Sequence, residues 1–427
     1  MFVGITNTPR NYAWGSTHAI ADLLGRTPSG GPEAELWLGA HAGSPAVIED
    51  AAQVGAANLA EWIAASPAVA LGADWAAREA DAGAPRLPFL LKILAAGRPL
   101  SLQAHPTTEQ ARAGFDLENE AGIAVDAGNR NYRDPFHKPE LIFALSDTFE
   151  ALCGFRPLAE VRGIIAELRL LDLATENPQA AALDLLENNL AQGLRDTVDW
   201  LLRDGRGDDS GEVKWLVERV VALAEHAEFL AGGGAAIGYA RELATVRALA
   251  AEYPGDPGMV IALLLNRVSL RRGEVLYLPA GNIHAYLSGL GVELMAASDN
   301  VLRGGLTPKH IDIDELLTVL DFTAGPAPYL APVVLADGVS RYRPGVTDFE
   351  LVHIKADADA ASSTPVPMRQ IALTGPAIAI CTAGGFLVAG ASSSRAVKRG
   401  QAVFVTPDEG TLTFAGTGEV FLATTGA

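Results

Sequence analysis

The chain has 427 residues, of which 49% are hydrophobic and 19% charged, a composition that predicts a globular protein with two or three sizeable domains. Its formal net charge of −19 argues against nucleic acids and anionic membranes as partners, so an anionic substrate would need a locally basic pocket. Only two cysteines occur, and the first 15 residues lack the pattern of a signal peptide. We therefore expect a reduced, cytoplasmic protein.

Residues 1 to about 155 are rich in glycine, proline and short apolar runs, such as LPFLLKIL at 87–94. This pattern predicts a β-rich region with some helix around 57–81. From about 156 to 255, apolar residues recur at i, i+3, i+4 and i+7, which predicts a helical domain inserted into the chain. A polar loop at 204–211 is expected to separate helices within it.

Strand and turn patterns return over 256–325 and continue, without a helical period, over 326–427. The two stretches share an internal similarity, because RGEVLYLPAGNIHAYL from Arg272 resembles RGQAVFVTPDEGTLTF from Arg399. The second segment has no histidine opposite His284. We expect a mainly β chain with two related barrels, of which the first holds the site, although strand–turn–strand segments also resemble one another by chance.

Three strand-like segments place polar, metal-capable side chains two residues apart: SLQAHP, HKPELIFAL and YLPAGNIHAYL. Because alternate residues of a strand share one face, Gln103 and His105 can converge on one ion, and Glu140 and His284 would complete four ligands. This set suits zinc, while the amide also admits manganese, cobalt or iron. The competing interpretation is that each histidine is a hydrogen-bonded core residue, and the matched parity of three strands supports the metal interpretation against it.

Four basic residues lie in or beside these segments of an acidic chain: Lys92, Lys138, Arg303 and Lys309. Arginine offers phosphate a planar pair of donors, and lysine offers a point charge. The segment DNVLRGGLTPKH also has the pattern of a helix start, with Thr307 as the cap and Pro308 at the first helical position. We expect both features together, a helix that begins close to a bound anion.

With these residues assembled, the chain resembles the type I mannose-6-phosphate isomerases, a family of zinc-dependent cupin enzymes, over nearly its whole length. The resemblance rests on NYAWG, PEAELWLGAH, LPFLLKIL, SLQAHP, HKPE and LPAGNIHAYLSGLGVELMAASDNVLRGGLTPKHID. It implies a cupin or jelly-roll catalytic domain formed by residues 1–155 and 256–325. It also implies a helical domain at 156–255 and a second, cupin-like β domain at 326–427.

The same resemblance implies one zinc ion per chain, with the ligands Gln103, His105, Glu140 and His284. The residues that it implies for catalysis are Arg303, Glu293, Lys138 and Asp299. Those that it implies for substrate binding are Trp14, Glu35, Lys92, Ser101, Tyr286 and Lys309. Two positions depart from the family pattern, because no proline follows His41 and because Phe136 stands where a polar residue is usual.

The implied reaction interconverts mannose 6-phosphate and fructose 6-phosphate by moving a proton between C2 and C1 through an enediol. A base must reach carbon, and the candidates for it are the carboxylates of Glu293 and Asp299 and a histidine or lysine with a lowered pKa. The alternatives are a metal-binding cupin that acts on another sugar phosphate, a sugar-phosphate sensor, and a metal-dependent oxygenase. A sensor would be expected to lack Glu140 or Arg303, and both are present. We expect a monomer whose only partner is a small sugar phosphate.

Overall fold

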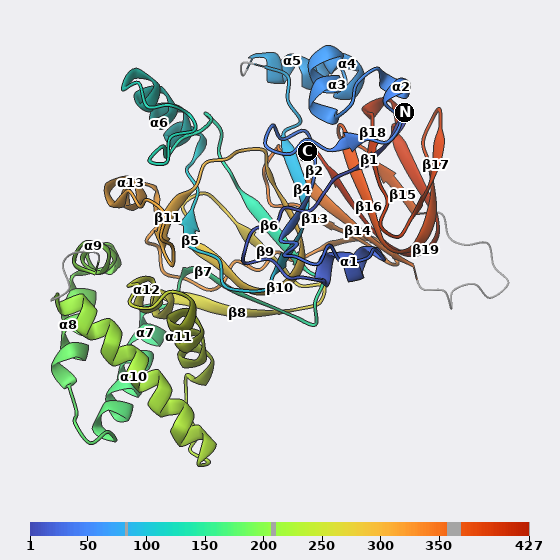
Figure 1. Cartoon of the computed structure of the whole chain (residues 1–427). Coiled ribbons are helices and arrows are strands. Elements are labelled where there is room, and N and C mark those ends of the chain that lie inside the picture. The colour runs from blue at the N-terminus through green and yellow to red at the C-terminus, as the bar shows by residue number, and fades with distance from the viewer. Residues whose placement is uncertain (82–83, 206–210, 357–368, 427) are drawn as a thin grey trace.

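The computed structural model describes residues 1–81, 84–205, 211–356 and 369–426, so most of the loop expected at 204–211 lies outside the described residues. The strands form two sheets, and a group of helices extends from one of them (Figure 1). Helices and strands are about equally abundant, so the expectation of a mainly β chain needs correction. The difference arises because several helices also lie in the regions expected to be β-rich.

The first sheet is built around the long strand β10 (His284–Ala296). The N-terminal half of β10 pairs with β5 (Leu102–Ala104) and β7 (Thr148–Phe155), and its C-terminal half pairs with β4 (Phe89–Ala96) and β6 (Glu140–Ala144). The sheet also contains β2 (Glu35–Leu38), β8 (Leu265–Arg271), β9 (Val275–Leu278) and β11 (Leu302–Gly305). Because β10 pairs with different strands along its length, it connects the strand that carries Gln103 with the strands that carry Lys92 and Glu140.

The second sheet is built around β19 (Thr411–Thr424). Its other strands from the C-terminal part of the chain are β12 (Val333–Ala336), β13 (Val339–Tyr342), β14 (Glu350–Ala356), β15 (Arg369–Ala372), β16 (Ala377–Ala389), β17 (Ser394–Lys398) and β18 (Ala402–Val405). Two strands from the start of the chain, β1 (Phe2–Thr6) and β3 (Val47–Ile48), extend this sheet beside β18. The N-terminal strand therefore belongs to the sheet that the C-terminal part of the chain builds, and Figure 1 shows the N-terminus beside β18.

The internal similarity of the sequence corresponds to equivalent strands in the two sheets. The strands β9 and β10 begin at Val275 and His284, and β18 and β19 begin at the aligned residues Ala402 and Thr411. The connections differ, because only the second contains a short 3₁₀ helix, Pro407–Glu409. The central strands of both sheets thus follow the same pattern, while the histidine occurs only in the first.

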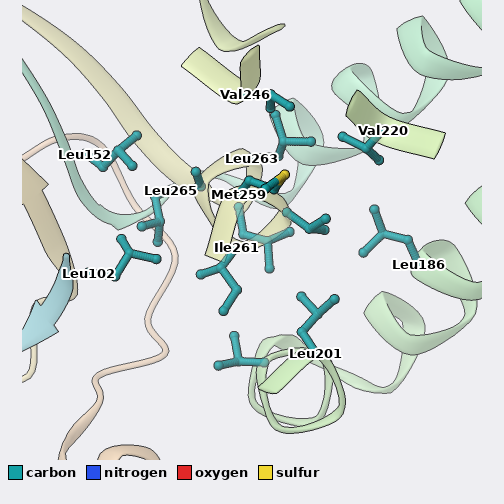
Figure 2. Close-up of a cluster of buried hydrophobic side chains, with 14 of the residues drawn as sticks. Leu102, Leu152, Leu186, Leu201, Val220, Val246, Met259, Ile261, Leu263 and Leu265 are labelled. Atoms are coloured by element: carbon teal, nitrogen blue, oxygen red, sulfur yellow. The ribbon is translucent and has the colours of Figure 1, made fainter. Parts of the chain in front are cut away.

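Between β7 and β8, the described residues form α7 (Leu158–Leu173), α8 (Ala180–Gln192), α9 (Leu194–Asp204), α10 (Glu212–Gly232), α11 (Ala240–Glu252) and α12 (Gly258–Leu264). Every residue of α12 is buried, as expected for a helix that is apolar on all sides. Figure 2 shows Met259, Ile261 and Leu263 between side chains of the first sheet and those of the other helices. One hydrophobic core therefore joins these helices to the first sheet. None of the helices in the described ranges has the length and apolar character that crossing a membrane requires.

The remaining helices are α1 (Ala19–Leu24), α2 (Ala51–Val54), α3 (Leu59–Ala65), α4 (Pro67–Ala70), α5 (Ala73–Asp81), α6 (Thr108–Glu120) and α13 (Ile313–Val319). The sequence analysis missed α6, which begins with a capping box between Thr107 and Gln110. The prediction that a helix begins at Thr307 is wrong. Helix α13 begins at Ile313, because Asp312 caps it by accepting a hydrogen bond from the backbone N of Glu315 at 3.1 Å.

Candidate metal centre and active site

Three neighbouring strands bring four polar side chains together. Gln103 lies in β5 directly opposite His284, the first residue of β10. His105 follows β5, and Glu140 begins β6, where it faces Met295 of β10. All five residues of β6 are buried, so Glu140 is a carboxylate at the end of an otherwise apolar core strand. The structure thus gathers the residues that the strand parity grouped.

The distances within this cluster are short enough for one ion to contact all its members. Glu140 Oε1 lies 3.3 Å from His105 Nε2, and Glu140 Oε2 lies 3.4 Å from His284 Nε2. The possible ligand atoms of these three residues lie within 4.8 Å of one another. The carboxamide of Gln103 lies 3.4 Å from His284 Nε2, and a half-turn of its amide group would present its oxygen instead.

The hydrogen bonds around the cluster leave ligand atoms free to bind a cation. His105 Nδ1 lies 2.7 Å from the backbone O of Asn300, and His284 Nδ1 lies 2.9 Å from that of Asn282. These carbonyls require N–H groups at both Nδ1 positions, so each Nε2 has its lone pair available. His105 Nε2 and Glu140 Oε2 are buried atoms without a hydrogen-bond partner. Nitrogen and carboxylate donors of this kind fit a zinc-type ion.

The electrostatic environment favours the protonation states that a metal needs. Burial, together with the positive charge of Lys138, lowers the pKa of His105 to about 4. Burial alone would raise the pKa of Glu140, but Lys138 and His105 outweigh it and hold the pKa well below its usual range. Metal ligands must be deprotonated, and this site keeps the imidazole neutral and the carboxylate charged.

A cavity of about 510 Å³ opens beside this cluster, and Gln103 and Glu140 line it. The other predicted site residues in its wall are Trp14, Glu35, Lys92, Ser101, Lys138, Tyr286, Glu293, Asp299, Arg303 and Lys309. His105 and His284 do not form part of this wall, and each is buried against Glu140. The structure therefore brings all the predicted site residues to one location.

One wall of the cavity carries a buried network of alternating charges. Lys92 Nζ lies 2.8 Å from Glu293 Oε2 and 3.4 Å from Glu35 Oε1, and Trp37 Nε1 donates to Glu35 Oε2 at 2.9 Å. Burial alone would lower the pKa of Lys92, but Glu293 and Glu35 outweigh it and raise that pKa, so the ammonium stays charged. Burial raises the pKa of Glu293, and the nearby carboxylates of Glu140 and Glu35 add to this effect against Lys92.

Another part of the cavity wall is positively charged. Arg303 and Lys309 line it, and neither has an ion-pair partner within the described ranges of the chain. Burial lowers the pKa of Arg303, and the nearby Arg133 lowers it further. Burial also lowers the pKa of Lys309, as do the charges of Arg303 and Arg133. Cations that repel one another without a carboxylate between them form a site for an anion.

His41 lines the cavity, although the sequence analysis assigned it no role in the site. Its Nε2 lies 3.2 Å from Asp299 Oδ2, and both side chains line the cavity. Burial alone would raise the pKa of Asp299, but the hydrogen bond and charge of His41 lower it below its ordinary value. The chain separates the two residues so widely that no local spacing pairs them. Further lining residues that were missed are Tyr12, Trp37, Tyr253 and Thr307.

The unusual Phe136 has a structural role beside the site. The guanidinium of Arg86 lies 3.6 Å from the centre of its ring, a cation–π contact. Arg86 Nη1 donates to the backbone O of Ala297 at 3.2 Å, and its Nε lies 2.9 Å from Glu79. Phe136 therefore packs against Arg86, which holds the backbone two residues before Asp299. A polar residue at this position would not make the cation–π contact with Arg86.

The fold and the site define a two-sheet protein with a buried candidate metal centre beside a cavity for a small anionic ligand. A model of the catalytic domain of type I phosphomannose isomerase matches residues 2–158. Mannose-6-phosphate isomerase from Escherichia coli (strain K12) is 36% identical over 419 residues, which cover 97% of each chain. The corresponding protein of Rattus norvegicus is 32% identical over 363 residues, covering 81% of this chain and 80% of the relative.

Solved structures agree over the whole length. A single-residue mutant of phosphomannose isomerase from Salmonella typhimurium has a TM-score of 0.83 and 31% identity, with complete coverage of both chains. A mannose 6-phosphate isomerase bound with zinc and yttrium has a TM-score of 0.81 and 33% identity, again over both complete chains. The chain belongs to the type I phosphomannose isomerase family.

Proposed function

We propose that the protein is a mannose-6-phosphate isomerase that interconverts D-mannose 6-phosphate and D-fructose 6-phosphate and depends on one zinc ion per chain. The observation that carries this proposal is the buried group of His105, Glu140 and His284 beside a cavity with an anion-binding end. The zinc-bound relative supports zinc as the ion. The identity to the Escherichia coli enzyme over nearly the whole chain supports the substrate.

The proposed ligands of the zinc ion are Gln103, His105, Glu140 and His284. A divalent ion at this point supplies Lewis-acid polarisation of a sugar oxygen. The backbone carbonyls of Asn300 and Asn282 orient the two imidazoles and fix their tautomers, which tunes them as ligands. Lys138, whose Nζ lies 3.1 Å from Glu140 Oε1, adds a positive charge near the oxygen that becomes negative in the reaction.

The proposed reaction moves a proton between C1 and C2 of the open-chain sugar through a cis-enediol. Lys92 stays protonated in its carboxylate pair and is therefore not the base. Of the two carboxylate candidates, we favour Glu293, because burial and neighbouring carboxylates raise its pKa toward the range useful for accepting and returning a proton. Asp299 has a lowered pKa beside His41, which suits a role in binding a hydroxyl group.

The remaining cavity residues are proposed to hold the substrate. Arg303, Lys309 and Ser101 would contact the phosphate, with Arg303 also stabilising charge as a catalytic residue. Trp14 stacks with Tyr12 at a centroid distance of 5.8 Å, and this pair offers an apolar surface to the sugar. The polar groups left for the sugar hydroxyls are Glu35, Lys92 and Tyr286.

We also propose that both sheets are cupin-type, or jelly-roll, domains. Residues 1–155 and 256–325 would form the catalytic domain, 156–255 the helical domain and 326–427 the second β domain. The equivalent strand pairs of the two sheets support this division, with β1 and β3 shared across it. We further propose a cytoplasmic monomer that acts on a small sugar phosphate alone.

A coupled assay tests the proposed function. Fructose 6-phosphate formed from mannose 6-phosphate is measured on protein whose metal content is quantified before and after chelation. We expect about one zinc per chain, loss of turnover on chelation and its recovery when zinc is restored. Bound zinc without turnover of mannose 6-phosphate would contradict the proposed substrate and point to another sugar phosphate or to a sensor.

A further inference from the structure

The anion end of the cavity lies on a loop with a strained backbone. Leu306 has a φ of 55°, and no other non-glycine residue in the described ranges has a positive φ. Such conformations persist only where the surrounding structure holds them, and they concentrate at functional sites. The segment 303–309, here called the anion loop, runs from the end of β11 through Leu306 and contains both Arg303 and Lys309. A helix N-terminus does not hold it, because α13 begins only at Ile313.

The last loop of the helical segment, residues 253–258, packs directly against the anion loop and is here called the clasp. A β-carbon on Gly305 would lie 3.0 Å from Gly258 Cα, and one on Gly258 would lie 3.0 Å from the backbone N of Leu306. Only glycines allow two backbones this close approach. The side chain of Leu306 is fully buried in the hydrophobic core that also contains Met259 of α12.

Asp256 makes one hydrogen bond within the clasp and one to the anion loop. Its Oδ1 accepts a hydrogen bond from the backbone N of Gly258 at 2.8 Å, and its Oδ2 accepts one from the backbone N of Thr307 at 3.4 Å. Thr307 Oγ1 accepts in turn from the backbone N of Lys309 at 3.2 Å. One carboxylate thus connects the start of α12 to the residue that presents the lysine.

The clasp also contacts the segment that leads to Ser101. Tyr253 lines the cavity, and its hydroxyl donates to the backbone O of Pro99 at 2.9 Å. Pro99 lies two residues before Ser101, which lines the cavity as well. Asp256 itself is not part of the cavity wall, so any effect that it has on a ligand must pass through the anion loop.

We propose that Asp256 is a positioning residue that holds the anion loop so that Arg303 and Lys309 face the phosphate of the substrate. The helical segment then sets the affinity for the phosphate end through the clasp, without taking part in proton transfer. The identity of the phosphate as that of a sugar rests on the proposed function. A role confined to capping α12 would instead affect only the stability of the helix.

The test compares Asp256→Asn with wild type. An amide has one acceptor oxygen and cannot serve both backbone N–H groups, so the bond to Thr307 or to Gly258 is lost. We expect the KM for mannose 6-phosphate and the inhibition constant of inorganic phosphate each to rise about fivefold, with kcat changed by less than about twofold.

Asp50→Asn is the matched control. Asp50 Oδ1 likewise accepts a hydrogen bond from the backbone N two residues later, that of Ala52 at 3.2 Å, but it does so at the remote helix α2. It should leave both constants unchanged.

Binding of inorganic phosphate, measured by calorimetry on wild type, D256N and D256A, gives a readout that does not depend on turnover. The proposal requires phosphate affinity to fall in D256A, which loses both hydrogen bonds, while thermal melts show this variant folded at the assay temperature. Variants that melt lower but bind phosphate like wild type would overturn it, as would a fall in kcat at constant KM. An inactive wild type that still binds phosphate would refute the proposed function and leave this test of Asp256 intact.

Discussion

Lys92 Nζ and Glu293 Oε2 lie 2.8 Å apart, and the two residues face each other directly across β4 and β10. Both are buried, so neither charge has water to replace its partner. Removal of Lys92 leaves buried carboxylates without their cation, which costs about 3–5 kcal/mol, whereas Lys92 keeps Glu35 at 3.4 Å when Glu293 is removed. The same ion pair therefore stabilises the first sheet and forms part of the wall of the candidate active site.

A double-mutant cycle should reveal this coupling. We expect Lys92→Met to lower the free energy of unfolding by about 3 kcal/mol or more and Glu293→Gln to lower it by less, because Glu35 still pairs with Lys92, and the double variant to lose clearly less than the sum. Urea unfolding of the four proteins provides the measurement. The matched control is the half-exposed pair Arg169–Glu187 at 2.6 Å, where single changes should cost about 1 kcal/mol or less. Additive effects at Lys92 and Glu293 would contradict the expected coupling.

Loss of a single histidine should abolish metal binding. Because His105 Nε2 has no hydrogen-bond partner and faces Glu140, we expect His105→Ala to be purified with little zinc, whereas wild type retains about one ion per chain. Chelation should lower the Tm of wild type and leave that of the variant unchanged, because only a bound ion stabilises the fold. Metal analysis and thermal melts give both results.

The control for this prediction is His18→Ala, since His18 is exposed and its side chain makes no cap hydrogen bond at α1. It should keep its zinc and its response to chelation. Equal metal content in wild type and His105→Ala would remove His105 from the set of ligands.

Local periodicity explains which parts of the site the sequence could predict. Gln103 and His105 are two residues apart, and so are Lys138 and Glu140, so strand geometry alone puts each pair on one face. The meeting of His284 with Gln103 depends on the register between β10 and β5, which the chain does not encode locally. The matched parity of the three strands suggested that relationship, and the resemblance to a known family implied the same set of residues.

Other features depend on contacts between distant segments. The pairing of His41 with Asp299 brings two loops together, and neither loop has a periodic pattern. The region around Thr307 carries a typical helix-start sequence, yet the backbone there follows the clasp through Asp256. Tertiary contacts override local propensity at this point, and the strained Leu306 shows where they do so.

Arg303 should be essential for turnover but not for metal binding. It lines the cavity without an ion-pair partner in the described ranges, so its charge is available to the substrate. We expect Arg303→Ala to lower kcat/KM by about a hundredfold or more at unchanged zinc content, and Arg303→Lys to recover only part of it, because lysine lacks the planar pair of donors. Steady-state kinetics with metal analysis measures both effects.

Arg271→Ala is the control, because the side chain of Arg271 is 83% exposed and pairs only with Glu274 within the described ranges. It should have wild-type kinetics. Substantial activity in Arg303→Ala would exclude the proposed catalytic role of this residue.

Stability at acid pH should depend on Glu419, in the second sheet. Burial alone would raise its pKa, but His353 at 3.1 Å, Arg272 at 2.9 Å and Thr382 lower it to about 2. The pKa of Glu419 in the folded protein lies below the ordinary value of 4.5. Its charge therefore contributes fully to stability above pH 4.5, and this contribution is lost as the pH falls toward 2. Glu419→Gln should therefore cost about 3 kcal/mol at pH 7 and about 2 kcal/mol at pH 3.5, by urea unfolding. The exposed Glu120→Gln should change little at either pH, and a cost for Glu419→Gln that is independent of pH would refute the ionic origin of the stabilisation.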